Sequence, residues 1–164
     1  MTAQGTEVTI REFIPGDEAA FRKLNEEWIT RYFFLEPKDV ASLIDPRTTI
    51  LDRGGKILFA IRDGQAVGCC ALLAVAPGEF EVAKMAVTES SRRNGIGRQL
   101  LEKVIAEARA SGARRLYLET NHKLVGAIRL YESLGFRHLP PEHVVASPYA
   151  RADVYMDLCL DHTA

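Results

Sequence analysis

The heptapeptide Arg92-Arg93-Asn94-Gly95-Ile96-Gly97-Arg98 lies between a strand-like run and a strongly helical one. It brings three arginines and two glycines to the point where a helix would begin. A helix N-terminus presents unpaired N–H groups and a partial positive charge, and glycines allow a phosphate to approach that backbone closely. Arginines add donors that fork onto phosphate oxygens. The heptapeptide is therefore a candidate diphosphate site.

The heptapeptide matches neither of two common nucleotide-binding patterns. The P-loop, which ends in Gly-Lys-Ser/Thr, does not occur in the sequence. The dinucleotide-binding pattern needs a third glycine at position 100, where the chain has Leu100. A glycine-containing turn from strand to helix with solvated arginines is the alternative interpretation, and the heptapeptide alone does not decide between the two.

The residues before the heptapeptide predict several strands and two helices. Asp63-Gly64 suits a tight hairpin turn between two β-type runs, because that turn needs positive φ. Phe21, Leu24 and Trp28 recur at helical spacing after Asp17, a candidate N-cap. The expected strands are residues 7–13, 56–62, 65–75 and 80–87, and the expected helices run from Asp17 and from Glu36 to Asp45-Pro46.

The residues after the heptapeptide predict alternating helices and strands. Apolar residues recur at helical spacing after Gly97, and Gly112 is a natural stop. Residues 114–120 and 150–160 are expected strands, and residues 124–135 are an expected helix that Gly135 ends. Because a run of strands precedes the late helices, the order predicts an α/β protein of the mixed α+β kind.

The composition is that of one globular domain with a substantial core. The chain has 164 residues, of which 47% are hydrophobic and 26% charged, and it has no internal repeat or linker, so residues 1–164 are expected to form a single domain. A formal net charge of −1 and the lack of a long apolar run exclude general attraction to nucleic acid and a membrane span of roughly 20 residues. The first residues lack the apolar centre of a signal peptide. Cys69, Cys70 and Cys159 have no metal-ligand spacing, so we expect buried thiols, a cytoplasmic location and no metal site.

Two motifs in this order resemble those of the GNAT-type N-acetyltransferase superfamily. The family hallmark, Gln/Arg-x-x-Gly-x-Gly/Ala after a strand that ends in valine, is filled by Arg92, Gly95 and Gly97. A second family motif, Ala-x-x-Leu-Tyr-x-x-x-Gly-Phe, is matched by Ala127, Leu130, Tyr131, Gly135 and Phe136. These motifs cover roughly residues 80–136, and the N-terminal third matches only by its order of elements.

The resemblance implies the acyl-CoA N-acyltransferase fold. In that fold helices flank a central, twisted, mostly antiparallel sheet, and the strands that carry Val87 and Leu118 would be parallel and splayed. It also implies acetyl-CoA as the acyl donor, with its pyrophosphate on the heptapeptide and its pantetheine arm along residues 85–87. The implied cofactor-binding residues are Met85, Ala86, Val87, Arg92, Arg93, Asn94, Gly95, Ile96, Gly97, Arg98, Asn121 and Tyr131.

Acetyl transfer to an amine needs a base, a donor for the oxyanion and an acid for the leaving thiolate. By resemblance Tyr131 is the general acid, and Glu81 stands where many relatives carry a base or a water-holding carboxylate. Glu79 is the rival on the same face of the strand, and a backbone N–H near residues 85–87 would serve the oxyanion. Leu124 stands where many relatives carry an asparagine that contacts the cofactor. Either Asn121 substitutes for it, which is the assignment made here, or the contact is absent.

The acceptor and the partners stay open at this stage. Trp28, Tyr32 and Phe33 near acidic residues suit a cationic amine, or else they form a core-facing stripe, and His143 is a further candidate base. The predicted function is an N-acetyltransferase that acts on a primary amine of a small molecule or peptide. The alternatives are a non-catalytic acyl-CoA-binding sensor or interaction domain and, more weakly, a nucleotide-binding module. Family members are commonly dimers, so a homodimer is expected, with residues 152–160 as a candidate interface.

Overall fold

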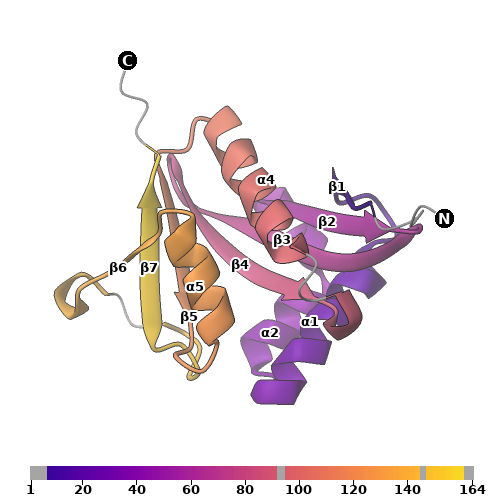
Figure 1. The fold of residues 1–164 in the computed structure, drawn as a ribbon, viewed down its shortest axis with the longest axis horizontal. Helices are drawn as coiled ribbons and strands as arrows, with labels where there is room; N and C mark the ends of the chain where they lie inside the picture. The colour runs from indigo at the N-terminus through magenta and orange to yellow at the C-terminus, as the bar shows by residue number, and fades with distance from the viewer. Residues whose placement is uncertain (1–6, 92–94, 145–146, 161–164) are drawn as a thin grey trace.

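The computed structural model describes residues 7–91, 95–144 and 147–160. Arg92, Arg93 and Asn94, the first half of the heptapeptide, lie outside the described residues. Within the described residues, seven strands form one sheet in the order β1-β2-β3-β4-β5-β7-β6 (Figure 1). The strands are β1 (Thr9–Glu12), β2 (Lys56–Arg62), β3 (Gln65–Ala76), β4 (Glu79–Val87), β5 (Arg115–Thr120), β6 (Arg137–His138) and β7 (Val154–Cys159).

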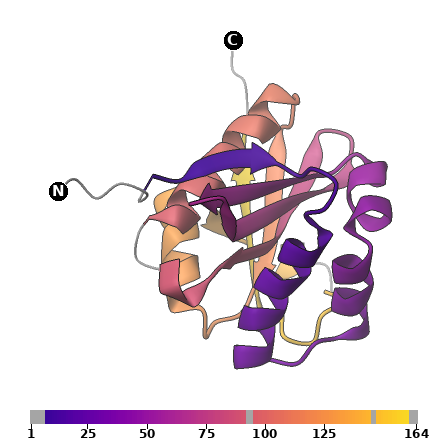
Figure 2. The same ribbon diagram turned by 90° about the vertical axis from the view of Figure 1, so that its right-hand side faces the viewer.

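Helices cover both faces of this sheet (Figures 1 and 2). The α-helices are α1 (Glu18–Tyr32), α2 (Pro37–Ile44), α3 (Pro46–Thr49), α4 (Ile96–Ala110) and α5 (Val125–Ser133), and the short 3-10 turns are Leu51–Arg53, Glu89–Ser91 and Pro141–His143. One buried cluster joins Leu100 and Leu101 of α4 and Tyr131 of α5 to the sheet. A second cluster joins Phe21 of α1 and Leu43 of α2 to the opposite face. No helix of the described ranges is long and apolar enough to cross a bilayer.

Local sequence accounts for most of these elements. The hairpin between β2 and β3 turns at Asp63 and Gly64, which both have positive φ, 52° and 75°, as the turn requires. Helix α4 buries the apolar stripe that includes Leu100, Leu101 and Val104, each 0% exposed, and the chain turns at Gly112 with φ 80°. The expected mixed sheet is therefore confirmed element by element.

Strands β4 and β5 form the one parallel pair among the described strands, and they soon separate. Their register pairs Glu79 with Arg115, Phe80 with Leu116 and Glu81 with Tyr117, and it ends there. The cause lies in β4, where the register against β3 shifts between Cys69 and Ala71. Lys84 occupies this bulge with a left-handed φ of 53°, and a bulge bends its strand and increases the twist. The predicted splayed parallel pair is confirmed.

Two local expectations need correction. Asp17 does precede α1, but its carboxylate does not cap the helix; it accepts hydrogen bonds from Arg11 Nη1 at 2.7 Å and from the Ile14 N–H at 2.8 Å. Cys69 and Cys70 are buried as predicted, whereas Cys159 is exposed. Along β7 the side chains alternate, and because Met156 is buried, Cys159 falls on the opposite, outward side.

Candidate active site

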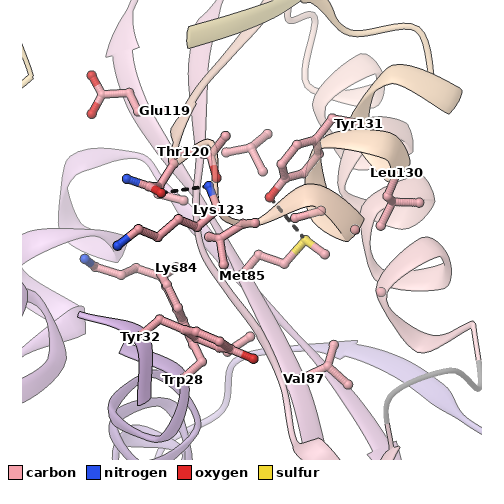
Figure 3. Close-up of a pocket in the computed structure, with 18 of the residues that line it drawn as sticks. Trp28, Tyr32, Lys84, Met85, Val87, Glu119, Thr120, Lys123, Leu130 and Tyr131 are labelled. Carbon is pink, nitrogen blue, oxygen red and sulfur yellow. Dashed lines mark hydrogen bonds between the residues drawn. The ribbon is translucent and has the colours of Figure 1, made fainter. Parts of the chain in front are cut away.

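A cavity of about 760 Å³ opens where β4 and β5 separate (Figure 3). Its walls come from α1, from the second half of β4, from the start of α4, from the end of β5 with the following turn, from α5 and from the loop before β7. The expected site residues that line it are Glu81, Met85, Ala86, Val87, Gly95, Ile96, Gly97, Arg98, Asn121 and Tyr131. Segments far apart in the sequence therefore meet at the fork between the two strands.

The start of α4 faces this cavity with little side-chain cover. Gly95 precedes the helix with φ 74°, in the left-handed region that favours glycine. A Cβ atom on Gly97 would lie 3.3 Å from Met85 Cε and 3.5 Å from Leu130 Cδ2, so the absence of a side chain lets α4 approach both β4 and α5. Arg98 Nη2 donates to Ser133 Oγ at 2.7 Å, which ties α4 to α5.

Tyr131 points from α5 into the fork (Figure 3). Its side chain is 8% exposed, and its hydroxyl lies 4.0 Å from Met85 Sδ on β4. Burial, followed by the neighbouring Cys70 thiol, raises the pKa of Tyr131 above its ordinary value. The phenol therefore keeps its proton at neutral pH, as a proton donor must.

Two carboxylates stand where β4 and β5 part. Burial, followed by the negative charge of Glu119, raises the pKa of Glu81 to about 7. Glu119 accepts hydrogen bonds from the Tyr117 hydroxyl at 2.9 Å and from Ser147 Oγ at 2.7 Å, which hold its carboxylate in place. Glu79 is absent from the cavity lining in the described chain and pairs with Arg115 at 3.3 Å instead. Glu81 is thus poised to exchange a proton near neutral pH.

Asn121 lies at the end of β5 and is 8% exposed. Its Nδ2 donates to the Arg151 carbonyl at 2.7 Å, and its Oδ1 accepts from the Lys123 N–H at 2.9 Å. The amide therefore joins the turn before α5 to the loop before β7, and one N–H stays available to a ligand. Its contact with the cofactor stays a prediction. Leu124 also lines the cavity.

A buried charge network forms the wall opposite α5. Asp39 of α2 is 0% exposed and accepts from Lys84 Nζ at 2.7 Å and from Arg151 through two bonds of 2.7 and 2.6 Å. Arg151 also pairs with Glu36 at 3.2 Å, and Lys84 donates to the Tyr149 hydroxyl at 3.1 Å. Burial opposes ionisation of Asp39, but the hydrogen bonds from Arg151 and Lys84 prevail and lower its pKa to about 2.

Sequence reasoning missed three of these residues. In a regular strand Lys84 would lie on the same buried face as Val82. A lysine at such a position indicates a bulge in the strand. Glu119 shares a strand face with Tyr117, which the parallel register sets beside Glu81. Asp39 forms a capping box with Glu36 at the start of α2, and that local pattern does not predict its contacts with Lys84 and Arg151. His143, the weaker candidate base, is exposed and lies outside the described cavity lining.

Comparison with known proteins agrees with this architecture. The family model "Acetyltransferase (GNAT) family" matches residues 20–136. An IAA acetyltransferase of Azospirillum brasilense is 35% identical over 136 residues, which cover 82% of this chain and 87% of that protein. A GNAT-family acetyltransferase from Staphylococcus aureus Mu50 superposes with a TM-score of 0.86 at 21% identity, over 94% of this chain and 100% of that one. The yncA protein of Salmonella typhimurium, solved with its cofactor acetyl-CoA, gives a TM-score of 0.71 at 22% identity, over 96% of each chain.

The mixed sheet with its forked parallel pair is the acyltransferase fold that these solved structures share. The chain belongs to the GNAT acetyltransferase family and is an N-acetyltransferase of that family.

The buried network makes a direct prediction for stability. In Asp39→Asn, Lys84 and Arg151 lose the carboxylate that neutralises them, so the free energy of unfolding should fall by about 3 kcal/mol or more. Urea unfolding at neutral pH measures this loss. The matched control is Asp52→Asn, a change at an exposed aspartate, which should shift the value by less than about 0.5 kcal/mol.

Unfolding of wild type and Asp39→Asn at different pH values separates the effect of the Asp39 charge from that of its side-chain shape. Because its folded pKa lies below the ordinary value of 3.8, its stabilising effect is present above that value and is lost as the pH falls toward about 2. The stability difference between wild type and Asp39→Asn should therefore shrink as the pH is lowered through this window. A difference that stays constant there would show that the ion pairs contribute nothing beyond packing.

Proposed function

We propose that residues 1–164 form one N-acetyltransferase domain that moves an acetyl group from acetyl-CoA directly to the primary amine of a small molecule or peptide. The proposal rests on the fork between β4 and β5. After Glu81 the edge of β4 no longer pairs with β5 and faces the cavity, opposite Tyr131 and beside the start of α4. An amide-bearing chain can pair with such an edge in the way an added strand does.

The cavity lining is compatible with an acyl-CoA donor. Met85, Ala86 and Val87 supply the strand edge for the pantetheine arm. Gly95, Ile96 and Gly97 supply amides of a helix N-terminus for the pyrophosphate, and in the proposal Arg92, Arg93 and Asn94 complete that loop. The structural relative solved with acetyl-CoA shares this fold, which supports the same donor here.

Deprotonation of the acceptor is assigned to Glu81. An aliphatic ammonium has an ordinary pKa of about 10.4, so at neutral pH it needs a base close by. Glu81, with its pKa raised to about 7, is a stronger base than an ordinary carboxylate and still ionises near neutral pH. Once the amine is neutral, it can attack the thioester carbonyl.

The remaining charges are assigned to a backbone N–H of residues 85–87 and to Tyr131. A fixed N–H donor beside the thioester would stabilise the oxyanion as it develops. The protonated Tyr131 phenol would then give its proton to the leaving thiolate as the carbon–sulfur bond breaks. The attacking nitrogen loses its second proton as the intermediate collapses, and that proton replaces the one that Tyr131 donated. The products are the amide, the free thiol of coenzyme A and a protonated Glu81.

The alternative is a sensor that binds acyl-CoA without turnover. It is favoured by Leu124, which lines the cavity where many relatives carry an asparagine. The enzyme is favoured by the placement of Tyr131 and Glu81 on either side of the fork. A homodimer stays a prediction; β7 pairs with β5 along Val154–Cys159, and with β6 only at Met156 and Asp157.

Tyr131→Phe tests the general acid. The Tyr131 hydroxyl has one hydrogen-bond partner among the described residues, Met85 Sδ at 4.0 Å, so its removal should leave the fold intact. We expect kcat to fall by about 100-fold or more and the Kd for acetyl-CoA to change little. Steady-state kinetics with a broad panel of amines measures the first effect, and calorimetry measures the second. Tyr155→Phe, a tyrosine outside the described cavity lining, is the matched control. Unchanged turnover in Tyr131→Phe would remove the tyrosine from the mechanism.

The two carboxylates predict a particular pH dependence. If Glu81 is the base, kcat/KM should rise with pH with a midpoint near its pKa of about 7, and Glu81→Gln should abolish that limb. Glu119→Gln removes the negative charge that helps raise the pKa of Glu81, so the midpoint should move to lower pH. A midpoint that does not move in Glu119→Gln, or a limb that survives in Glu81→Gln, would assign the proton transfer elsewhere.

A further inference from the structure

The aromatic residues at the acceptor end of the cavity are already engaged by cations of the protein itself. Arg151 lies 5.9 Å from the Trp28 ring centroid and 4.6 Å from that of Tyr149. Lys84 Nζ lies 4.7 Å from the Tyr149 ring, and Lys123 Nζ lies 6.0 Å from the Phe33 ring. A cationic acceptor would therefore meet ammonium and guanidinium groups there, so the expectation that these aromatics attract a cation does not fit their contacts.

We call Lys84, Lys123 and Arg151, with the rings that they contact, the cation–aromatic wall. The acidic side chains that pair with this wall do not balance all three of its positive charges. Lys84 and Arg151 are balanced by Asp39 and Glu36, whose carboxylates lie outside the cavity lining. Lys123 lines the cavity and, in the part of the chain that the structure describes, forms no ion pair. One positive charge at the cavity mouth is therefore available to a ligand.

Backbone contacts fix the place of Lys123. Its N–H donates to Asn121 Oδ1, and Asn121 in turn donates to the Arg151 carbonyl. The adjacent His122 N–H donates to Asp153 Oδ1 at 2.8 Å, which ties the same turn to the same loop a second time. Figure 3 shows Lys123 and Lys84 extending in the same direction across the cavity from different elements. Their ammonium groups therefore belong to one end of the cavity.

The negatively charged side chains of the cavity lie at the fork between β4 and β5. Glu81 and Glu119 line the cavity there, and both lack an ion-pair partner among the described residues. Glu119 lies on β5 two residues beyond Tyr117, which pairs with Glu81, so the two carboxylates are neighbours at the fork. The acceptor end of the cavity thus presents the carboxylates of Glu81 and Glu119 to the reacting amine and the unpaired ammonium of Lys123 at the cavity mouth. Such a bipolar cavity is complementary to a bipolar ligand.

We infer that the acceptor is an amine that also carries a carboxylate, such as a free amino acid, with its amine directed to Glu81 and Glu119 and its carboxylate to Lys123. The inference rests on the proposed function, and it narrows the acceptor class. A charge-assisted hydrogen bond of this kind is among the stronger polar contacts. Lys123 forms no ion pair with the described residues that the ligand would have to break. Diamines and the amines of basic peptides would be poor acceptors, because the cation–aromatic wall repels them.

The test compares three series of acceptors with acetyl-CoA as donor: free L-amino acids, their primary amides, and the amines that result from decarboxylation. The amide removes the negative charge with almost no change of shape and makes the amine easier to deprotonate, so a preference for the acid must come from binding its charge. We expect kcat/KM for the best acid to exceed that for its amide by about tenfold or more.

Variants locate the source of that preference. In Lys123→Gln the ratio of acid to amide should fall to about threefold or less, because kcat/KM falls for the acid and does not fall for the amide. Lys103→Gln, on the exposed face of α4 and outside the described cavity lining, should keep the wild-type ratio. Loss of activity in Lys123→Gln toward acid and amide alike would indicate a damaged site and overturn the assignment to Lys123.

The outcomes separate the inference from the proposed function. Equal or better turnover of amides or decarboxylated amines would overturn the carboxylate inference and leave the N-acetyltransferase proposal standing. A preserved ratio in Lys123→Gln would overturn the assignment of the carboxylate to that lysine. Turnover of a peptide amine but of none of the three series would overturn the carboxylate inference alone. Turnover of no amine at all, by a protein that binds acetyl-CoA, would contradict both proposals in favour of the sensor.

Discussion

The ion pair between Lys84 and the fully buried Asp39 holds a lysine in a left-handed conformation in the middle of the sheet. That conformation is unfavourable for a residue with a Cβ atom, by about 1–3 kcal/mol, so the surrounding contacts must enforce it. Asp39, Tyr149 and the neighbouring β3 do so. The resulting bulge bends β4 away from β5 after three paired positions, and the cavity exists because of that separation.

The same charges determine what each end of the cavity can bind. Toward α4 the lining is Gly95, Ile96, Gly97 and Arg98 at a helix N-terminus, which suits a phosphate with an amide-bearing arm. Toward α1 it is the cation–aromatic wall, in which Asp39 and Glu36 balance Lys84 and Arg151, and in our proposal Lys123 is left to the ligand. Glu81, the proposed base, lies between these two ends, where burial and Glu119 raise its pKa. In the proposed mechanism, donor binding, proton transfer and acceptor choice all depend on one distortion of one strand.

Local patterns in the sequence were sufficient for most of the fold. Helical periodicity located α4, and the Asp63-Gly64 dipeptide located the hairpin, because both depend on residues close in the chain. The splayed parallel pair came from resemblance to a family, since no local pattern encodes it. Lys84, Asp39 and Arg151 meet across 112 residues of sequence, so their network follows from tertiary structure alone. For the same reason Asp17, expected to cap α1, instead bonds to Arg11.

The central claim is that the fork binds an acyl-CoA, and the thermal midpoint of unfolding tests it most directly. The purified protein would be heated alone and with acetyl-CoA, ATP or NAD. Ligand at 100 times its Kd adds about 2.7 kcal/mol of stability, which for a domain of this size raises the midpoint by several degrees. We expect the midpoint to rise with acetyl-CoA and to change little with ATP or NAD. A rise with ATP or NAD alone, or no rise with acetyl-CoA, would contradict the central claim.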